Sequence, residues 1–531
     1  MVTMMKSKQD QKTNVLFITA DQWRGDCLSL LGHPNARTPN IDALARDATC
    51  FTRHYAQATP CGPARASLYT GLYLMNHRVC VNGSPMDARH TNVALEARRA
   101  GYEPTLFGYT DHSVDPRTVP SGDARLLTYE GVLPGFHQRL IMDTPPALEW
   151  LTWLRRQGVD VPGTMEDLYR TKQVARGDLS VGDHLTQRNF AAEHTESRFV
   201  TEDLLSFLSE RAGSGWFAHV SYIRPHPPFS VPEPYASMIS PSDISAPIRR
   251  PSLAEEQAQH PLLALGHQRN IKERYVTGQG EESSAAWTAE EVAEIRAVYH
   301  GMQAEVDAEI GRIIGHLKQS GDYENTLIVL TSDHGEMLGD HYMFGKFCYF
   351  DGAFHIPLII RMPGADRERG TQVHKFTEAV DIMPTMLEAL GLNIPSQVDG
   401  RSMVAFLNGE SPSDWRQEAH WEYDFRDVIA GKPERAFGLT LDQCQLSVMR
   451  GERHKYIHFP GLPAVFFDLE RDPNEFENRA EDPDYRHLVL EYAQKMLSWR
   501  MTHADRTLSG MVVGAAGLVT RSHDERQRPR Q

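Results

Sequence analysis

Thr326-Leu-Ile-Val-Leu-Thr-Ser-Asp-His-Gly-Glu336 is the stretch of the chain that indicates the fold most directly. Its first six residues form a short apolar and β-branched run, which is typical of a strand covered on both faces. Polar and ionisable side chains follow at once, beginning with Asp333 and His334. In α/β proteins with parallel strands, functional sites form at the carboxyl ends of the strands. The stretch therefore predicts a buried strand with a site at its end.

A long amphipathic helix is expected before this strand. Thr288 and Glu291 form a capping box at its start. Its apolar side chains then follow one another at steps of three and four residues: Ile295, Tyr299, Met302, Val306, Ile310, Ile313 and Leu317. Ser320-Gly321 ends the helix. A helix followed by a buried strand is the doubly wound α/β arrangement.

A second buried strand is expected in the run Asn14-Val-Leu-Phe-Ile-Thr-Ala20, which ends at Asp21. If the two strands are parallel, Asp21, Asp333 and His334 reach one edge of the sheet. Two carboxylates and an imidazole suit a divalent cation such as Mn²⁺, Ca²⁺ or Zn²⁺, and the oxygen majority favours the harder ions. On the residues alone, the alternative that each Asp only forms a turn or caps a helix remains open.

Further elements are expected from short local signals. Thr38-Pro39 is typical of an N-cap followed by a proline in the first turn of a helix. Thr59–Gly71 is typical of a Pro/Gly turn that leads into a helix with Pro63 in its first turn. The apolar run Pro357-Leu-Ile-Ile-Arg361 supports a sheet of several strands.

Cys61 lies at the start of the helix that contains Pro63, where unpaired backbone N–H groups and the helix dipole favour negative charge. A nucleophile there could attack an anionic ester held by the same amides. Arg65, one turn later, could orient the group at position 61. The residues alone leave open that Cys61 is a small buried side chain and that Arg65 forms an ordinary salt bridge.

The composition excludes several classes of protein. The 531 residues carry a net charge of −15 spread along the chain, which argues against nucleic-acid or anionic-membrane binding because both need a basic field. Six cysteines are too few for a disulfide scaffold of this length: Cys27, Cys50, Cys61, Cys80, Cys348 and Cys444. No stretch approaches about 20 uninterrupted apolar residues, so we expect a cytoplasmic protein that can still take a small anionic substrate.

Two later regions differ in character from the strand-and-helix part. Residues 225–280 are rich in Pro, Ser and Gln and predict long loops with short helices, which often form the wall or lid of a site. Beyond about Asn393, short strand-like pieces and a helix near residues 488–499 predict a smaller α+β part.

Several motifs occur together in the order that the sulfatase family shows. Cys61-Gly-Pro-Ala-Arg65 fits the Cys-x-Pro-x-Arg signature of that family, which lies within the alkaline phosphatase superfamily. Its neighbours agree with the family: Thr38–Asp42, Ser67–Gly71 and Thr331–Glu336. Other segments resemble the phosphonate monoester hydrolase and arylsulfatase branch: Asp21–Arg24, Thr70–His77, Arg224–Phe229, Glu422–Asp427 and Ser498–Arg500. The resemblance spans residues 13–508.

The resemblance implies an alkaline-phosphatase-like α/β/α sandwich with a smaller C-terminal α+β subdomain. The organisation then expected is a flexible N-terminus at residues 1–13, a catalytic domain at 14–392, a C-terminal subdomain at 393–513, and a flexible tail at 514–531. The segment from Ser498 to Leu508 resembles the oligomerising tail of the branch, so a homodimer or homotetramer is expected.

The resemblance also implies that a formylglycine-generating enzyme oxidises Cys61 to formylglycine. One hydroxyl of the hydrated aldehyde, activated by a metal, attacks sulfur or phosphorus and displaces the leaving group, which forms a covalent hemiacetal ester. The second hydroxyl then loses its proton, the C–O bond to the acid breaks, and the aldehyde returns. An ester of an ordinary serine has no second hydroxyl on the same carbon, so it cannot release the acid in this way.

By the same resemblance, Asp21, Asp333, His334 and residue 61 bind one divalent metal. Three further residues are expected at the substrate: Lys346 and Asn82 at its non-bridging oxygens, and His226 at the substrate or leaving group. Without the resemblance, Lys346 would be interpreted as a solvated lysine, Asn82 as a turn residue and His226 as a structural histidine.

The chain departs from the wider family at two of the implied ligand positions. Gln22 follows Asp21 where sulfatases commonly carry a second Asp, and His334 follows Asp333 where they carry Asn. Both differences resemble the phosphonate hydrolase branch. They lower the negative charge around the metal, which favours Mn²⁺ or Zn²⁺ over Ca²⁺.

Gly108-Tyr-Thr-Asp-His112 stands where sulfatases carry Gly-Lys-Trp-His and where the branch resembles Gly-Tyr-Thr-Thr. Tyr109 keeps the branch pattern and is expected to hydrogen-bond a substrate oxygen. A carboxylate at Asp111 repels an anionic ester unless it is paired, and neighbouring His112 is the candidate partner. His112 could instead protonate a leaving group or bind sulfate, and burial away from the site is the alternative for both residues.

The expected function is hydrolysis of sulfate monoesters and of phosphonate monoesters or phosphodiesters, because one diol and one set of cations serve any tetrahedral anion. The first alternative is a phosphonate monoester hydrolase or phosphodiesterase with only incidental sulfatase activity. The second, of another class, is a non-catalytic anion-binding protein with an unmodified Cys61.

Overall fold

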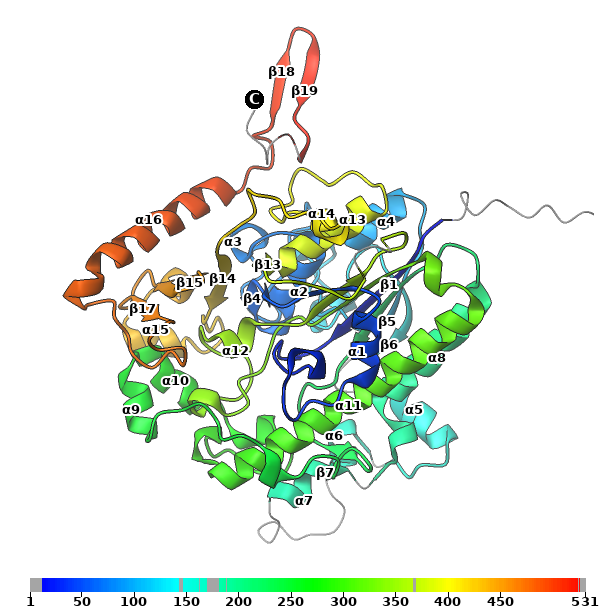
Figure 1. The fold of residues 1–531 in the computed structure, drawn as a ribbon, viewed down its shortest axis with the longest axis horizontal. Coiled ribbons are helices and arrows are strands. Elements are labelled where there is room, and N and C mark those ends of the chain that lie inside the picture. The colour runs from blue at the N-terminus through cyan, green and yellow to red at the C-terminus, as the bar shows by residue number, and fades with distance from the viewer. Residues whose placement is uncertain are drawn as a thin grey trace, which may run out of the picture.

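A mixed β-sheet forms the centre of the computed structural model, which describes residues 12–142, 147–161, 163–169, 181–187, 189–365, 369–523 and 525. Within these residues eight strands lie in the order β12-β2-β11-β10-β1-β8-β5-β6. Of these, β1, β5 and β6 are labelled in Figure 1. Their bounds are β1 Asn14–Ala20, β2 Thr49–Phe51, β5 Pro104–Gly108, β6 His137–Ile141, β8 Phe217–Tyr222, β10 Thr326–Thr331, β11 Leu358–Arg361 and β12 Thr371–Val373.

The two strands predicted to carry the site are neighbours at the centre of the sheet. β1 is parallel to β10, with Asn14 opposite Thr326 and Thr19 opposite Thr331. This register brings Asp21 and the residues after Thr331 to the same edge, as predicted. The predicted strand near Arg361 is present as β11, but it runs antiparallel to β10, so the sheet is mixed.

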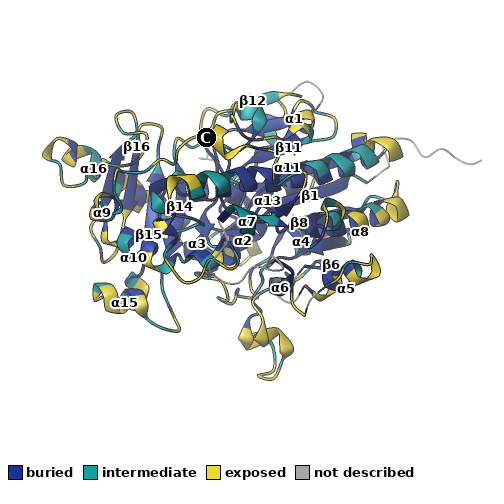
Figure 2. Ribbon diagram, turned by 90° about the horizontal axis from the view of Figure 1, so that it is seen from below, coloured by how far each residue is buried: buried dark blue, intermediate teal, exposed yellow. Residues whose placement is uncertain are grey.

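Helices cover both faces of the sheet, so the predicted α/β/α sandwich is confirmed (Figure 2). Alternate residues of β1 point to opposite faces: Val15 and Phe17 pack in one core, Leu16 and Ile18 in the other. One face carries α2 Cys61–Thr70, α4 Val93–Arg99 and α13 Ile382–Ala389. The other carries α1 Pro39–Ala45, α5 Leu148–Arg156, α8 Glu196–Arg211 and α11 Ala289–Ser320.

The helix α11 has the predicted capping box, in which Thr288 and Glu291 exchange bonds. Thr38 is the N-cap of α1 as predicted, but its side chain accepts from no backbone N–H of the helix and bonds the side chains of Ser29 and Asp42 instead. The N-terminus of α1 is capped from α11: the Asp307 carboxylate accepts from the backbone N–H groups of Asn40 at 3.1 Å and Ile41 at 2.8 Å. A cap supplied by a residue so far along the chain gives no local signal.

The C-terminal part is built on a second sheet, in the order β17-β16-β15-β14-β4. Its strands are β4 Ala58–Thr59, β14 Ala419–Asp424, β15 Gln445–Arg450, β16 His454–His458 and β17 Val465–Asp468, and α16 Arg486–His503 follows them. The predicted α+β character is confirmed. Because Thr59 pairs with Tyr423, the strand β4 ends two residues before Cys61, and its pairing fixes the position of the start of α2.

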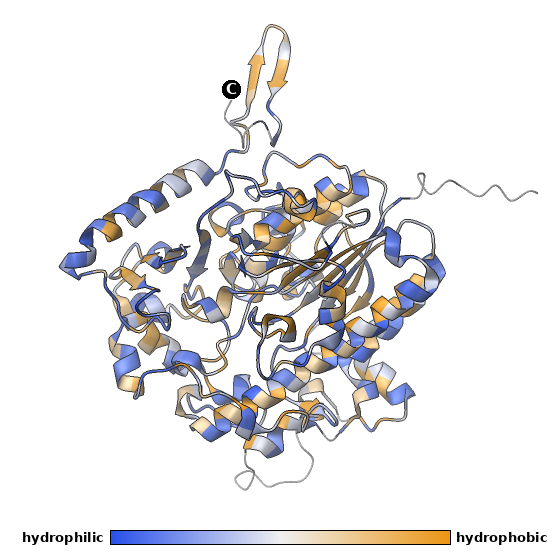
Figure 3. Cartoon of the chain, viewed as in Figure 1, coloured by the Kyte–Doolittle hydropathy of each residue, from blue (hydrophilic) through white to orange (hydrophobic). Residues whose placement is uncertain are grey.

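A hairpin of β18 Met511–Gly514 and β19 Gly517–Thr520 projects from the body of the molecule and is strongly apolar (Figure 3). The second half of this hairpin, up to Thr520, falls in the segment predicted as a flexible tail from residue 514. Residues 1–11, 524 and 526–531 lie outside the described part. Among the helices that the structure describes, none is long and apolar enough to cross a membrane.

Candidate active site

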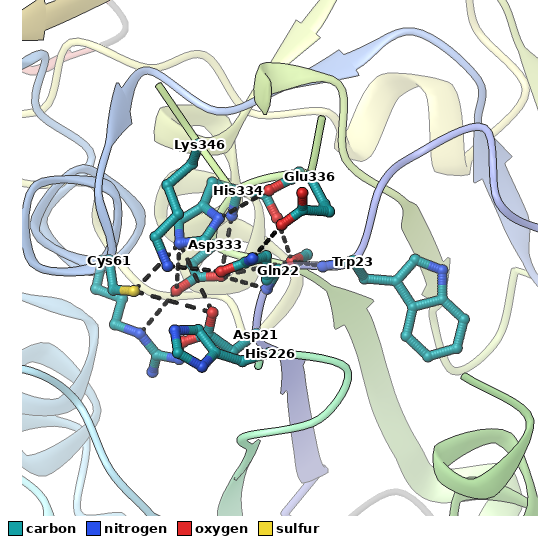
Figure 4. Close-up of polar contacts among 12 residues, drawn as sticks. Asp21, Gln22, Trp23, Cys61, His226, Asp333, His334, Glu336 and Lys346 are labelled. Atoms are coloured by element: carbon teal, nitrogen blue, oxygen red, sulfur yellow. Dashed lines mark hydrogen bonds and ion pairs between the residues drawn. The ribbon is translucent and has the colours of Figure 1, made fainter. Parts of the chain in front are cut away.

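Four ionisable side chains meet at the edge of the sheet where β1 and β10 end (Figure 4). Asp21 follows β1, Asp333 and His334 follow β10, and Cys61 is the first residue of α2. One ligand atom from each lies within 4.8 Å of the others, and all four residues are buried. The structure thus brings together the four residues proposed as metal ligands.

The donor atoms of this cluster fit a divalent cation. His334 Nδ1 lies 3.1 Å from the Gly335 carbonyl, to which only an N–H can donate, so Nε2 keeps its lone pair. That lone pair faces the cluster, with Nε2 3.2 Å from Cys61 Sγ and 3.6 Å from Asp21 Oδ1. An outer N–H on a carbonyl is the usual support for a metal-bound histidine. The described residues can therefore hold one metal ion.

Arg65 contacts the carboxylates of the cluster. Its guanidinium donates to Asp333 Oδ2 at 3.0 Å and to Asp21 Oδ2 at 3.2 Å. It also donates to Ser221 Oγ at 2.8 Å and to the Tyr109 carbonyl at 3.1 Å. Arg65 is fully buried and holds both carboxylates of the cluster that contains residue 61.

Charge around Asp21 favours its ionised form. Burial opposes ionisation, but His226, His334, Arg65 and Lys346 together hold the pKa of Asp21 below its ordinary value. Tyr109, expected at a substrate oxygen, instead donates its hydroxyl proton to Asp21 Oδ2.

Residue 61 occupies the start of α2 as predicted. The N-cap is Pro60, whose side chain has no polar atom and makes no capping hydrogen bond. Asn82 Oδ1 accepts the N–H of Gly62 at 2.9 Å. Burial raises the pKa of the Cys61 thiol well above its ordinary value, and Asp21 adds to this effect.

Two residues of the site, Gln22 and Glu336, were named within sequence motifs but were given no contact there. Lys346 Nζ donates to Gln22 Oε1 at 2.6 Å, while the Gln22 amide nitrogen donates to Glu336 Oε2 (Figure 4). Gln22 therefore joins Lys346 to Glu336 and, through its backbone N–H at 3.2 Å, to Asp333. Their places next to Asp21 and within the motif of Asp333 were the available signals.

A cleft of about 890 Å³ opens beside the cluster. Lys346, His226 and Asn82 line it, as do residues from 269–275 and 423–429. The prediction that the 225–280 region forms a wall of the site is confirmed, and its short helices are α9 Leu253–Ala258 and α10 Pro261–Arg269. His226 Nδ1 donates to the Pro227 carbonyl at 2.7 Å, and burial with nearby Lys346 lowers the pKa of His226 to about 3.

Asp111 and His112 do not form the suggested pair. Asp111 Oδ2 lies 3.6 Å from Arg65 Nε, so the arginine is its partner. Burial raises the pKa of Asp111 to about 7 although Arg65 opposes the shift. The backbone of His112 bridges to Gly131, and His112 is not among the described residues that line the cleft. Its proposed contact with substrate gains no support from this position.

Comparison with known proteins agrees with the geometry. The sulfatase family model matches residues 13–392, and a model described as N-sulphoglucosamine sulphohydrolase, C-terminal, matches residues 339–502. The multifunctional alkaline phosphatase superfamily protein PehA of Trinickia caryophylli is 43% identical and covers 96% of this chain and 100% of its own length. An arylsulfatase of Clostridium perfringens is 26% identical, covering 92% of this chain and 94% of its own.

The crystal structure of the phosphonate monoester hydrolase of Agrobacterium radiobacter superposes with a TM-score of 0.92 at 49% identity, over 96% of this chain and all of that one. The family resemblance predicted from the motifs is thus confirmed. The chain belongs to the sulfatase family of the alkaline phosphatase superfamily.

Proposed function

We propose that this chain hydrolyses sulfate monoesters and phosphonate monoesters or phosphodiesters at the edge of its central sheet. The observation that carries the proposal is the buried cluster of Asp21, Cys61, Asp333 and His334, which lies beside a cleft lined by Lys346. Family membership supports the same class of reaction, since the sulfatase family consists of metal-dependent ester hydrolases.

The cluster would hold one divalent metal, with residue 61 converted to formylglycine by a formylglycine-generating enzyme. Together these groups supply Lewis-acid activation and a hydroxyl nucleophile that ordinary side chains lack. Mn²⁺ or Zn²⁺ is proposed ahead of Ca²⁺, because Gln22 and His334 are neutral.

The chain's own residues bind and orient the ester. Lys346 neutralises charge on the non-bridging oxygens, and its bond to Gln22 fixes its direction. Asn82 uses Oδ1 to accept from Gly62, which leaves its amide N–H groups to donate to the same oxygens. His226 has its Nδ1–H committed to Pro227, so Nε2 is the atom it offers to the substrate or leaving group.

Phosphonate esters as the main substrates, with incidental sulfatase activity, are the second candidate. It is favoured by the 49% identity to a phosphonate monoester hydrolase, against 26% to an arylsulfatase. Steady-state kinetics with an aryl sulfate and a phenylphosphonate monoester rank the two. A preference of orders of magnitude in kcat/KM for the phosphonate supports this second candidate over the first.

Mass spectrometry of the Cys61 peptide tests the proposed chemistry. Conversion of cysteine to formylglycine lowers the mass by roughly 18 Da. Metal analysis on the same sample should find one divalent ion per chain. An unmodified thiol in a protein without metal would leave the non-catalytic, anion-binding alternative.

The chain is also proposed to form a homodimer or homotetramer through the segment from Ser498 to Leu508, and the exposed hairpin that follows this segment supports the proposal. An isolated two-stranded hairpin is marginal in water, and this one exposes 85% of Val513 and 62% of Val519. Light scattering should give a multiple of 60.0 kDa for the full chain and a smaller mass after Val513→Ser and Val519→Ser. A monomeric full chain contradicts the proposal.

The six cysteines are all unpaired and buried. This supports the proposal of a reducing compartment such as the cytoplasm.

A further inference from the structure

Two arginines that the proposed reaction does not use line the cleft beside Lys346. Arg269 ends α10, and Arg274 follows five residues later. Within the described part of the chain, neither guanidinium has a hydrogen bond or an ion pair. The third arginine of the cleft, Arg426, differs because Asp424 neutralises it at 2.8 Å. Arg269 and Arg274 thus offer planar donor groups of the kind that bind carboxylates in a bidentate manner.

Hydrogen bonds join the segment that carries both arginines to the loop that contains Lys346. Asn270, the residue after Arg269, donates to the Phe344 carbonyl at 3.3 Å. The hydroxyl of Tyr275, the residue after Arg274, lies 2.9 Å from the same carbonyl. Phe344 is two residues before Lys346 in the chain. The positions of the two arginines are therefore set relative to the group that binds the reacting ester.

The same segment is also bonded to the loop of His226. The backbone N–H of Phe229 donates to the Tyr275 carbonyl at 2.6 Å. Because His226 is proposed to lie at the substrate or leaving group, the two arginines are placed on the leaving-group side of the cleft. A second anionic group there would be held apart from the reacting sulfur or phosphorus.

The charge of the cleft exceeds what a single ester anion needs. Among the described lining residues, four are basic and two are acidic: Arg269, Arg274, Lys346 and Arg426 against Asp424 and Asp427. Lys346 serves the ester, and the pair of Arg426 and Asp424 cancels. Arg269 and Arg274 then exceed Asp427, whose pKa is lowered by a backbone hydrogen bond and by the charge of Arg269, by one positive charge. This positive remainder stands out in a protein with a net charge of −15, and a second anion on the substrate would balance it.

The rest of the cleft is apolar and aromatic. Its lining includes Tyr129, Phe347, Tyr423, Val428 and Ile429. Ile429 is fully exposed and Val428 is 67% exposed, which is costly for large aliphatic side chains unless something covers them. An aryl or other apolar leaving group fits between this surface and the arginines.

We propose that Arg269 and Arg274 form an anion subsite that selects esters whose apolar leaving group carries a second negative group, such as a carboxylate. The inference rests on the proposed ester hydrolysis and names its substrate class. The subsite binds the product alcohol as well as the ester, because the second anion is not altered by the reaction.

Two phenylphosphonate monoesters test the proposal, one with phenol and one with 3-hydroxybenzoate as leaving group. A carboxylate in the meta position changes the acidity of the phenol little, so the two esters have similar intrinsic reactivity. We expect kcat/KM to favour the carboxylated ester about tenfold or more at low ionic strength. Arg269→Gln and Arg274→Gln should each reduce this ratio, and the double variant should bring it near one.

The controls separate the subsite from other effects. Arg486→Gln removes an exposed arginine from α16, away from the cleft, and should leave the ratio unchanged. All variants should hydrolyse the ester with phenol as leaving group, which has no second anionic group, like the wild type. A wild-type ratio near one, or a ratio that survives in the double variant, overturns the inference while the proposed hydrolysis stands.

Binding of 3-hydroxybenzoate by calorimetry gives a readout that needs no turnover. The wild type should bind it more tightly than the double variant does, and the difference should shrink with added salt. Equal affinities of the two proteins overturn the inference, whether or not the esters are hydrolysed. Failure to hydrolyse either ester counts separately, against the proposed function.

Discussion

The described residues contain two clusters in which cysteine and histidine bring potential metal ligands within 4.8 Å of one another. The first is the candidate active site with Cys61 and His334. The second, formed by Cys27, His33 and His300, lies between the loop after β1 and helix α11. Both are largely buried, so proximity and burial alone do not tell them apart.

The hydrogen bonds of the imidazole and thiol groups distinguish the two clusters. In the second cluster His33 Nδ1 accepts the backbone N–H groups of Asn35 and Ala36, at 3.3 and 3.1 Å. A neutral imidazole that accepts at Nδ1 carries its proton on Nε2 and has no further lone pair for a metal. The Cys27 thiol, for its part, lies 3.5 Å from Asp26 Oδ1, to which it can donate. In the second cluster His33 therefore offers no lone pair to a metal, and only His300, whose Nδ1 donates to Gln303 Oε1 at 2.9 Å, could do so. In the first cluster the Nε2 lone pair of His334 faces two carboxylates and residue 61, so more ligand atoms point at one place.

The largest expected difference is catalytic. Cys61→Ala should lower kcat/KM by at least about 10⁴-fold, because it removes the proposed nucleophile. Cys27→Ala removes a thiol that is equally buried and should leave kcat/KM within about twofold of the wild type. Steady-state kinetics on an aryl ester measures both. Comparable losses in the two variants would place Cys27 in the active site and break the contrast.

The next largest expected difference between the two clusters is in metal binding. The wild type should bind one divalent ion per chain, and His334→Ala should weaken that binding by at least about 10–100-fold, since even changes beyond the ligand shell have effects of this size. His300→Ala should retain one ion. Calorimetric titration of the metal-free protein with Mn²⁺ or Zn²⁺, checked by elemental analysis, gives affinity and stoichiometry. Two ions per wild-type chain would show that the second cluster also binds metal.

The contrast shows what the sequence could reveal. The ends of β1 and β10 were predictable because short apolar runs followed by Asp21 and Asp333 are local signals, and parallel pairing makes them meet. The motif around Cys61 added the start of α2. These features fixed the sandwich and most of the site without knowledge of any contact.

Features that depend on distant contacts were not predictable. Gln22 meets Lys346 across 324 positions of the chain, and Asp307 caps α1 across 267 positions. Arg269 and Arg274 of the cleft lie at the end of the short helix α10 and in the 3₁₀ turn that follows it, in a region without long-range periodicity. The partner of Asp111 was sought in adjacent His112, yet Arg65 reaches it from α2. In each case the tertiary fold supplies a partner that local sequence cannot indicate.

A smaller effect is expected from the bridge that supports the first cluster. Gln22→Leu removes the acceptor of Lys346 and the donor to Glu336, so kcat/KM should fall about tenfold while the metal is retained. Gln259→Leu is the matched control, because Gln259 bonds the carbonyls of Glu475 and Phe476 away from the cleft. It should affect stability but not kcat/KM. Loss of metal from the Gln22 variant would instead place Gln22 among the ligands.

The smallest effect concerns α11, which carries His300 of the second cluster and, two turns later, Asp307. Asp307→Ala leaves the N–H groups of Asn40 and Ile41 without their acceptor, so the free energy of unfolding should fall by about 1–2 kcal/mol. The kcat/KM of the folded protein and its metal content should not change, because α11 acts here through packing and capping. Glu290→Ala, an exposed change in the first turn of the same helix, should stay within about 0.5 kcal/mol. Denaturant unfolding measures the stability of both variants. If Asp307→Ala lowers kcat/KM without lowering stability, the polar groups of α11 serve the reaction.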